Sequence, residues 1–402
     1  MIGGEVNRTD TRARRGLGPG WVLFWALFAA QSAILVLSPI LPQVAQEFGV
    51  STGVAAQLRS VSGVTAGVVA LAFAVTGDRF RLSWLIHGGL GTLAVSSLLS
   101  AAAPSFTVLL VAHVLMGFGL AAIVSGGMAA SEAWAGSGER TKVLSLALIG
   151  QPVAWVVGQP VAGLVAGHNW RWAWLAVPFA SAIVGLLAMT VRDRTIPDEG
   201  RDCDPLGLWK LPGVRRWALA ELLAFTAWGG ALVYAGAVYI ERYGLSVETT
   251  GLVLGAGAAL YLPGNALGRR LIDRSIRSVL VTWSLAAAAM VVIHGVGSFP
   301  LWVSIAGFGL AVFFAGGRTI AGAALGLELS RGRRLAAMSV RTGAGQFGYL
   351  IGAVVGGALL EWGGYTALAA GFGAIFALAG VLHLGPGGHQ LDATGVLRRS
   401  RR

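Results

Sequence analysis

The sequence has little charge and almost no cysteine. Only 12% of its 402 residues are charged, about half the share of a typical soluble domain. By contrast, 55% are hydrophobic and the mean hydropathy is +0.71. These values exclude an ordinary soluble domain and indicate an integral membrane protein. The single cysteine, Cys203, excludes an internal disulfide, so the fold does not depend on an oxidising compartment.

Sequence motifs of enzymes and ATP-driven pumps are also missing. We find no Walker loop, no metal-ligand cluster and no nucleophile elbow. We therefore expect neither an enzyme nor a bound metal or cofactor, and transport driven by ATP is disfavoured. The net charge of +12 would favour a nucleic-acid partner in a soluble protein. Here the basic residues cluster between apolar runs, so we expect no nucleic-acid partner.

Twelve apolar stretches are long enough to cross a bilayer. A membrane helix needs roughly 20 apolar residues to span about 30 Å of hydrocarbon. No small-residue cleavage site follows the first stretch, so we interpret it as a membrane helix and not as a signal peptide. The sequence predicts an all-α integral membrane protein with twelve transmembrane helices, at residues 21–41, 57–76, 83–102, 106–131, 143–166, 172–191, 217–239, 250–268, 277–297, 301–326, 337–360 and 364–384.

A polar segment with mixed charges divides the predicted spans into two groups of six. Two six-helix bundles with pseudo-symmetry are implied. The predicted regions are an N-terminal cytoplasmic tail (1–20), an N-terminal bundle (21–191), a cytoplasmic linker (192–216), a C-terminal bundle (217–385) and a basic cytoplasmic tail (386–402).

The distribution of lysine and arginine predicts the orientation. When each loop is assigned to the side that alternate crossing dictates, nearly all basic residues fall on the side of the termini. On the other side we expect only Arg59, Arg171 and Arg242, and Arg318 lies within a span. Cytoplasmic loops carry the excess of basic residues. We therefore expect a multi-pass protein of the cell membrane, in contact with lipid, with both termini in the cytoplasm.

The six-helix unit is repeated along the chain. Four short matches relate the first half to the second at a nearly constant offset. They pair residues 48–51 with 243–246, 78–79 with 273–274, 117–121 with 307–311, and Gly138 and Arg140 with Gly332 and Arg334. A parallel duplication is typical of transporters whose two bundles move about a site near the membrane midplane.

Twelve spans, this repeat and an Asp-Arg pair in two equivalent loops resemble the major facilitator superfamily over essentially the whole chain. Within it, the sequence is similar to the twelve-helix branch of drug and metabolite exporters, which are often proton-coupled antiporters. Asp78 and Arg79 match the signature between spans 2 and 3, with Ala74 at its first glycine. In the span 4 signature, His113 stands at the position of the family's arginine.

The span 5 signature of antiporters is represented by Gly158, Pro160 and Gly163. Proline removes a backbone donor, so we expect span 5 to bend there. Glycines spaced along spans 5 and 11 form ridges of small residues that predict close approach of helices.

Charged residues at the predicted cytoplasmic ends are candidates for conformational gating. Asp78 with Arg79, and Asp273 with Arg274, lie where helices meet cytoplasm. The resemblance implies that these acids join a network that breaks and reforms during transport. Its further members would be Glu132, Arg140 and Glu328. The alternative is that all of them are surface charges that mark topology.

Ionisable residues inside spans are rare, and each is a candidate for function. His113 in span 4 is a candidate proton carrier, with a neutral packed histidine as the alternative. Arg318 in span 10 lies too far from the cytoplasm to reach it. It is expected either to bind an anionic part of the substrate or to pair with an acid. Glu221 in span 7 is that acid, unless it reaches cytoplasmic water.

Aromatic residues recur on single helical faces of two spans. Glu221, Phe225 and Trp228 share a face of span 7, and Phe28 and Gln31 share one of span 1. The resemblance implies that spans 1, 4, 7 and 10 line a central cavity, where these residues would form an apolar site with few polar groups. Packing on lipid or on neighbouring helices is the alternative.

The sequence therefore favours a monomeric secondary transporter that exports drug-like or small metabolite molecules, with protons as the coupling ion. His113 or Glu221 would carry the proton, and Asp78 would gate. An importer or facilitator of a small nutrient, anionic ones included, is the first alternative. A receptor or assembly protein that uses the fold as a scaffold is the second.

Overall fold

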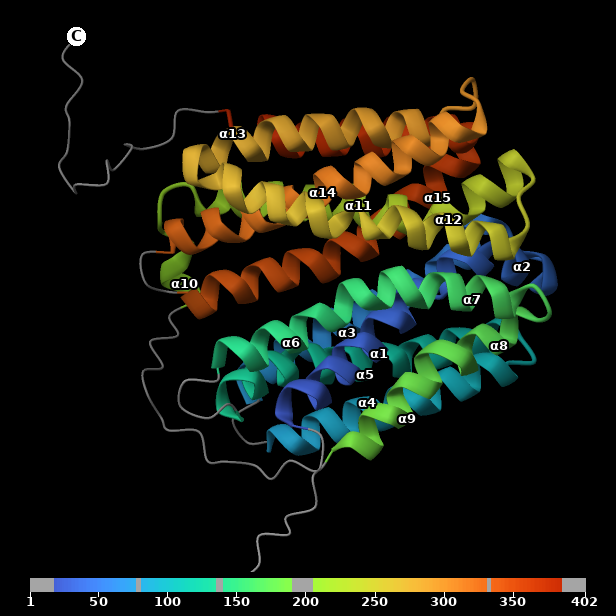
Figure 1. Cartoon of the computed structure of the whole chain (residues 1–402), viewed down its shortest axis with the longest axis horizontal. Helices are drawn as coiled ribbons and strands as arrows, with labels where there is room; N and C mark the ends of the chain where they lie inside the picture. Colours follow the sequence, from blue (N-terminus) through green and yellow to red (C-terminus); the bar gives the residue numbers. More distant parts are fainter. Residues whose placement is uncertain (1–17, 77–80, 135–139, 190–204, 331–333, 385–402) are drawn as a thin grey trace, which may run out of the picture.

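The structure is a computed structural model that describes residues 18–76, 81–134, 140–189, 205–330 and 334–384. These ranges are helical and contain no β-strand (Figure 1). In the bilayer every backbone polar group must be satisfied within the segment, which apolar runs of this length achieve only as helices. The fold is the all-α membrane architecture that the sequence predicts.

The N-terminal half consists of α1 (Pro19–Leu35), α2 (Leu37–Phe48), α3 (Thr52–Thr76), α4 (Leu82–Ala102), α5 (Phe106–Ala133), α6 (Arg140–Val153), the π-helical segment η2 (Ala154–Gly158), α7 (Gln159–Ala166), α8 (Trp170–Trp174), the π-helical segment η3 (Leu175–Phe179) and α9 (Ala180–Ala188). The C-terminal half consists of α10 (Pro205–Leu208), α11 (Val214–Ala237), the π-helical segment η4 (Val238–Arg242), α12 (Val247–Ala259), α13 (Tyr261–Gly295), α14 (Leu301–Leu329) and α15 (Arg334–Val381).

Helix α13 is two membrane helices joined at a kink. Ser275 has non-helical backbone angles, with φ −166° and ψ 107°. The part before the kink advances in the same direction as α14, and the part after it advances in the opposite direction. The contacts are Gly264 with Phe313 and Gly268 with Gly317 before the kink, and Trp283 with Gly317 and Ile293 with Gly307 after it. The chain therefore reverses at Ser275.

Helix α15 reverses in the same way at Gly363 and Gly364, where Gly364 has a φ of 65°. Its first part runs parallel to α11, and its second part runs antiparallel to the end of α13. The contacts are Gly348 with Phe225 and Gly356 with Tyr234 in the first part, and Gly373 with Val292 and Gly380 with Ser284 in the second.

These two reversals complete twelve crossings. Within the described residues, nine helical segments are long and apolar enough to cross a membrane, and the pair α1 and α2, bent by 41°, makes a tenth. Two of the nine contain the reversals at Ser275 and Gly363, and each therefore crosses twice. The prediction of twelve transmembrane helices is confirmed.

The repeat is visible in the structure, because helices of the two halves begin at equivalent residues and have equivalent N-terminal caps. Helices α1 and α11 begin at equivalent positions of the repeat, and so do α3 and α12. Ser51 caps α3 by accepting a hydrogen bond from the amide of Val54, and Ser246 caps α12 from Thr249. Gly49 and Gly244, two residues earlier, have φ of 63° and 68°, a region that favours glycine.

One predicted match of the repeat is out of register. Gly117 lies against Ser62 and Thr65 of α3, whereas Gly307 lies against Met290, in the C-terminal counterpart of α4. The two glycines therefore face different neighbours. The predicted alignment matches the letters of these two segments but not their helical faces.

The two halves meet along three pairs of elements. In Figure 1 the N-terminal half is coloured blue to green and the C-terminal half yellow to red. Helix α3 packs along the first part of α15, η2 and α7 pack along α12, and α2 packs on α11. A methyl group added to Gly163 of α7 would lie 2.8 Å from the Cα of Gly251 in α12. Small residues thus allow the close contact between bundles that the glycine ridges predict.

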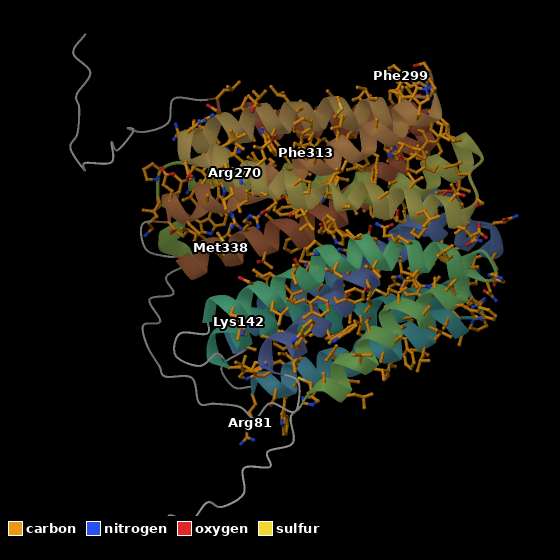
Figure 2. All side chains as sticks on the ribbon, in the orientation of Figure 1. Arg81, Lys142, Arg270, Phe299, Phe313 and Met338 are labelled. Atoms are coloured by element: carbon orange, nitrogen blue, oxygen red, sulfur yellow. The ribbon has the colours of Figure 1, made fainter. Side chains whose placement is uncertain are left out.

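The two ends of the molecule differ in charge. We call the end with the close of α2 and the start of α3 the α2 end, and the opposite end, with α10, the α10 end. Arg81, Lys142 and Arg270 lie at the α10 end (Figure 2). At the α2 end the described acidic residues are Glu47, Glu241, Glu248 and Glu361.

Candidate functional site

A buried cluster of three charges lies inside the C-terminal half. Glu221 of α11 is fully buried, and Arg318 of α14 is 3% exposed. An Arg318 Nη1 lies 2.7 Å from Glu221 Oε1, and Arg341 Nε of α15 lies 2.8 Å from Glu221 Oε2. Two cations share one carboxylate, so the cluster carries a formal charge of +1. The predicted pairing of Arg318 with Glu221 is what the structure shows.

Neighbouring groups hold this cluster in place. Glu221 lies against Gly322, where any side chain would collide with the carboxylate. Arg318 also donates to the carbonyl of Ala220 at 3.2 Å, and Arg341 donates to the carbonyl of Thr319 at 2.9 Å. These bonds leave Nε of Arg318 as a buried donor without a hydrogen-bond partner among the described residues. A buried ion pair needs this additional hydrogen bonding to offset its desolvation.

The position of Arg341 corrects an expectation. The sequence assigns it to the cytoplasmic charges, whereas in α15 it is only 18% exposed and contacts Glu221. Its guanidinium carbon also lies 5.3 Å from the ring centre of Phe225, a cation–π contact. Arg341 lies close to the start of the predicted span 337–360, but its side chain points inward and pairs with the buried carboxylate of Glu221.

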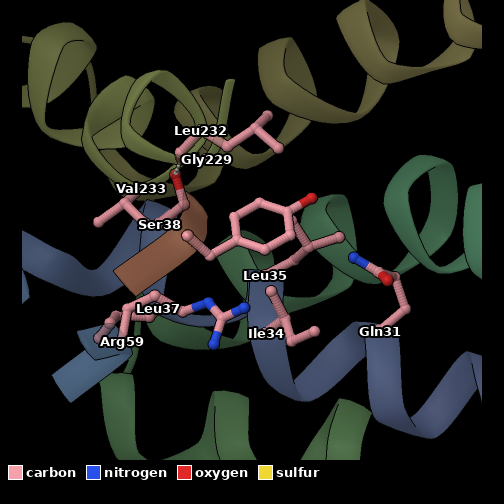
Figure 3. A pocket seen from close by; sticks show the side chains of 10 residues that line it. Gln31, Ile34, Leu35, Leu37, Ser38, Arg59, Gly229, Leu232 and Val233 are labelled. Atoms are coloured by element: carbon pink, nitrogen blue, oxygen red, sulfur yellow. Dashed lines mark hydrogen bonds between the residues drawn. The ribbon is translucent and has the colours of Figure 1, made fainter. Parts of the chain in front are cut away.

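A central pocket lies between the halves. It is small in the state described, with a cavity volume of about 10 Å³, which is room for about one water molecule. Both halves line it, through Gln31, Ile34, Leu35, Leu37, Ser38 and Arg59 on one side and Gly229, Leu232, Val233 and Tyr349 on the other. Figure 3 shows the Arg59 guanidinium and the Gln31 amide reaching into the same space from opposite sides.

Arg59 is the second correction. The sequence counts it with the basic residues of the outer side, at the third residue of the predicted span 57–76, whereas it is the eighth residue of α3 and 2% exposed. Its Nη1 donates to Ser62 Oγ at 3.0 Å, and its guanidinium carbon lies 4.9 Å from the ring centre of Tyr349. Its Nε and Nη2 are buried without a hydrogen-bond partner among the described residues.

A signal for Arg59 was present in the repeat. Ser51 and Ser246 are equivalent in the predicted alignment, and the second-half span was expected to begin at residue 250. The same spacing would start span 2 at residue 55 and not at 57, which places Arg59 two residues deeper in the span.

His113 lies inside the N-terminal half. It is 1% exposed, and its Nδ1 is 2.9 Å from the carbonyl of Leu109 one turn earlier. Its ring meets Trp174 of α8 edge-on, with centroids 5.2 Å apart. The histidine is not among the residues that line the central pocket. Its role as a proton carrier stays a prediction.

The predicted aromatic face of α11 divides among three surroundings. Glu221 joins the buried charges, Phe225 lies 6.2 Å from the ring of Tyr349, and Trp228 lies 6.2 Å from Trp155 across the bundle interface. The pocket itself is lined by the next turns of α11, at Gly229, Leu232 and Val233. Gln31 lines it as expected of a cavity residue, and Phe24 and Phe28 are buried beside it in α1.

The predicted gating residues are described only in part. Asp78 and Arg79 lie outside the described residues, and the side chains of Glu132 and Arg140 do as well. Asp273 and Arg274 are exposed beside the kink at Ser275, and Glu328 is exposed near the end of α14. No ion pair joins these three within the described part of the chain.

The span 5 residues lie at the contact between bundles. Pro160 sits against Gly255 of α12, and Gly163 sits against Gly251. Gly158 faces Val177 and closes the π-helical segment η2. A π-helical turn next to proline is how a helix absorbs a missing backbone bond and bends.

Polar contacts close the α2 end between the halves. Thr52 Oγ1 donates to Glu241 at 2.6 Å, and Ser51 Oγ donates to Glu361 at 3.3 Å. Deeper in, Ser38 Oγ donates to the carbonyl of Leu232 at 2.7 Å and accepts from the amide of Gly236 at 3.3 Å. These contacts join both bundles on the α2 side of the pocket.

The two halves, the twelve crossings and a pocket between them are matched by one family. The sequence profile of the Major Facilitator Superfamily matches residues 23–294 and 218–391. The chain belongs to this superfamily. It is a membrane transporter and not an enzyme, and its second match begins at the first turn of α11, where the repeat begins again.

The named relatives have low sequence identity to this chain but match it over most of its length. The chain is 26% identical to the uncharacterised transporter YceJ of Bacillus subtilis, over 74% of this chain and 77% of that one. It is 24% identical to the purine ribonucleoside efflux pump NepI of Escherichia coli, over 87% of this chain and 89% of the pump.

Solved structures share the fold at lower identity. A bacterial homologue of the human lysosomal transporter Spinster, inward-facing and occupied, matches with a TM-score of 0.71 at 14% identity, over 91% of this chain and 94% of that one. The human organic anion transporter MFSD10 matches with a TM-score of 0.67 at 17% identity, over 90% and 98%. These likenesses support the fold alone.

Proposed function

We propose that the protein is a secondary exporter that moves a small metabolite or drug-like molecule through the central pocket by alternating access. The observation that carries the proposal is a mainly apolar pocket with a few polar groups, whose two walls come from different bundles. Rocking of the halves would expose such a pocket to one side and then the other. The relative that is named as an efflux pump supports the outward direction.

The proposed orientation places the α10 end in the cytoplasm of a cell-membrane protein. The basic residues at that end favour this assignment, because cytoplasmic loops carry the excess of lysine and arginine. The state described would then be closed on the outside, with the α2 end sealed. Asp78, Glu132 and their basic neighbours remain proposed members of a gate at the α10 end.

Proton coupling is proposed to act through Glu221. Its carboxylate holds Arg318 and Arg341, which come from two other helices. A proton on Glu221 would remove the negative charge that attracts both guanidinium groups. Arg341, the more exposed of the two, would then be free to move toward the space between the bundles. His113 is the second proposed carrier, although it lies away from the pocket.

Everted membrane vesicles that contain the chain test this function. A proton gradient, acid inside, should drive accumulation of at least one compound in a panel that includes labelled adenosine and benzoate. An uncoupler and Glu221→Gln should each abolish the accumulation. If nothing accumulates in everted vesicles while right-side-out vesicles take up an anionic nutrient, the protein is an importer. If neither preparation responds, the transport proposal is wrong.

A further inference from the structure

The central pocket contains a buried cation without a counter-ion. Of the ten described residues that line it, Arg59 is the only charged one, and none is acidic. Among the described residues Arg59 takes part in no ion pair, although Arg318 and Arg341 do. A charge in the membrane interior normally pairs with an acid or faces a functional cavity.

The unsatisfied atoms of Arg59 lie on one edge of its guanidinium group. Nη1 is held by Ser62, whereas Nε and Nη2 have no partner in the described part of the chain. Nε and Nη2 together form the edge that binds a carboxylate with two parallel hydrogen bonds. One acceptor with two oxygens would satisfy both atoms at once.

The face of the guanidinium is fixed by Tyr349. The ring centre lies 4.9 Å from the guanidinium carbon. Tyr349 reaches this place because Gly229 has no side chain, since a methyl group there would collide with the ring. This contact restricts how Arg59 turns, as preorganised anion sites require.

The fold itself does not need an arginine at this position. Helices α3 and α12 start at equivalent positions of the repeat with equivalent serine caps, so the counterpart of Arg59 is Leu254. Leu254 is fully buried at the eighth position of α12. An apolar residue therefore satisfies the same place in the other half.

We infer that the central pocket, once the movement of the halves has widened it, binds an organic carboxylate, with the two oxygens on Nε and Nη2 of Arg59 and the apolar body against Ile34, Leu35 and Leu232. This inference rests on the proposed function, because it names the substrate class of the same pocket. A carboxylate fits better than a phosphate dianion, because the pocket supplies one cation. Gln31 adds an amide at the opposite side.

The test uses three probes that share a phenyl ring: benzoate, benzamide and phenyl phosphate. The full chain is placed in nanodiscs of phosphatidylcholine, so that no anionic lipid competes, and its thermal unfolding is followed as each probe is titrated. Benzoate should raise the unfolding temperature in a saturable way, and benzamide should not. Phenyl phosphate should act more weakly than benzoate.

Four variants test whether benzoate binding depends on the two-donor edge of Arg59, and not on positive charge alone or on an effect on folding. Arg59→Gln should abolish the response to benzoate, and Arg59→Lys, which keeps the charge but lacks the two-donor edge, should weaken it by about tenfold or more. Gly229→Ala should weaken it by displacing Tyr349. Arg242→Gln removes one positive charge at the α2 end, where this side chain donates to the carbonyl of Gly295, and should leave the response unchanged.

Four results would overturn the inference, and a fifth would remove only the proposed function. Equal stabilisation by benzamide would mean that the pocket reads the ring and not the charge. Stronger stabilisation by phenyl phosphate would assign a phosphate. No response to any probe would contradict a carboxylate site. Export of adenosine that is insensitive to Arg59→Gln would leave the proposed function standing without this inference, whereas benzoate binding without transport would leave the site and remove the function.

Discussion

The two halves of the molecule contain buried arginines in opposite situations. In the C-terminal half, Arg318 and Arg341 share the carboxylate of Glu221 and donate to carbonyl groups. In the N-terminal half, Arg59 has one hydroxyl partner, one aromatic ring and an unsatisfied edge. In the first arrangement the charges are paired, although Nε of Arg318 has no hydrogen-bond partner among the described residues. The second is complete only when something else occupies the pocket.

The repeat sharpens this contrast. The counterpart of Glu221 is Ala26, and the counterpart of Arg59 is Leu254, both in the alignment that relates α1 to α11 and α3 to α12. Both counterparts are fully buried. Each half therefore carries its charges where the other half is apolar, which indicates that neither set is required by the shared fold.

The largest effect should follow from removing the shared carboxylate. Glu221→Gln leaves two buried guanidinium groups without a counter-charge and should lower the free energy of unfolding by about 3–5 kcal/mol. Glu328→Gln, which changes an exposed glutamate, should alter it by no more than about 0.5 kcal/mol. Thermal and denaturant unfolding in the same detergent compare the two. Equal effects would show that the cluster contributes nothing to stability.

At Arg59 we expect a substitution to raise the free energy of unfolding, the opposite of the effect at Glu221. Arg59→Met replaces unsatisfied donors with an apolar chain of similar length and should raise the free energy of unfolding by about 1–3 kcal/mol. Arg318→Met, the matched change in the other half, should lower it, because Glu221 then loses one partner. The same unfolding assay without ligand measures both. Destabilisation by Arg59→Met comparable to that by Arg318→Met would make Arg59 a structural residue.

A smaller effect is expected from the buried bonds between bundles. Ser38→Ala removes the donor to Leu232 and the acceptor for Gly236, and should weaken closure of the α2 end by about 1 kcal/mol. That corresponds to about a fivefold change in the ratio of closed to open molecules. Spin labels at Gln46→Cys and Thr249→Cys, with Cys203→Ser, report the distance across this end. An unchanged distance distribution would contradict a role of Ser38 in closure.

The smallest effect should come from the exposed bond between Thr52 and Glu241. Thr52→Val keeps the shape of the side chain and removes the donor to this carboxylate. Because water competes for both groups, the change in closure should be at most about 0.5 kcal/mol. The same spin-label pair measures it beside Ser38→Ala. A larger shift than that of Ser38→Ala would reverse the proposed order of the two contacts.

Much of the fold could be predicted from the sequence because it depends on the length and spacing of apolar runs. Twelve apolar stretches, each long enough to cross a bilayer, predicted twelve crossings, and the glycine and serine pattern around Ser51 and Ser246 predicted the repeat. Which face of a helix meets which neighbour could not be predicted from the sequence. Gly117 and Gly307 match by letter, yet they face different neighbours.

The site was predicted less completely, for a similar reason. Pairing of Arg318 with Glu221 could be predicted because both lie inside spans and have opposite charges. Arg59 and Arg341 were missed because both lie close to predicted helix ends, where a long basic side chain usually reaches the interface. Only tertiary contacts, with Tyr349 and with Glu221, show that these two side chains turn inward.

The most direct test of the contrast between the halves is a structure of the full chain with 4-bromobenzoate, located by the anomalous signal of bromine. The account predicts the carboxylate on Nε and Nη2 of Arg59 and the bromine in the apolar part of the central pocket, with Glu221 still bound to Arg318 and Arg341. A carboxylate bound to Arg341 or Arg318 in place of Glu221, with Arg59 unoccupied, would contradict it.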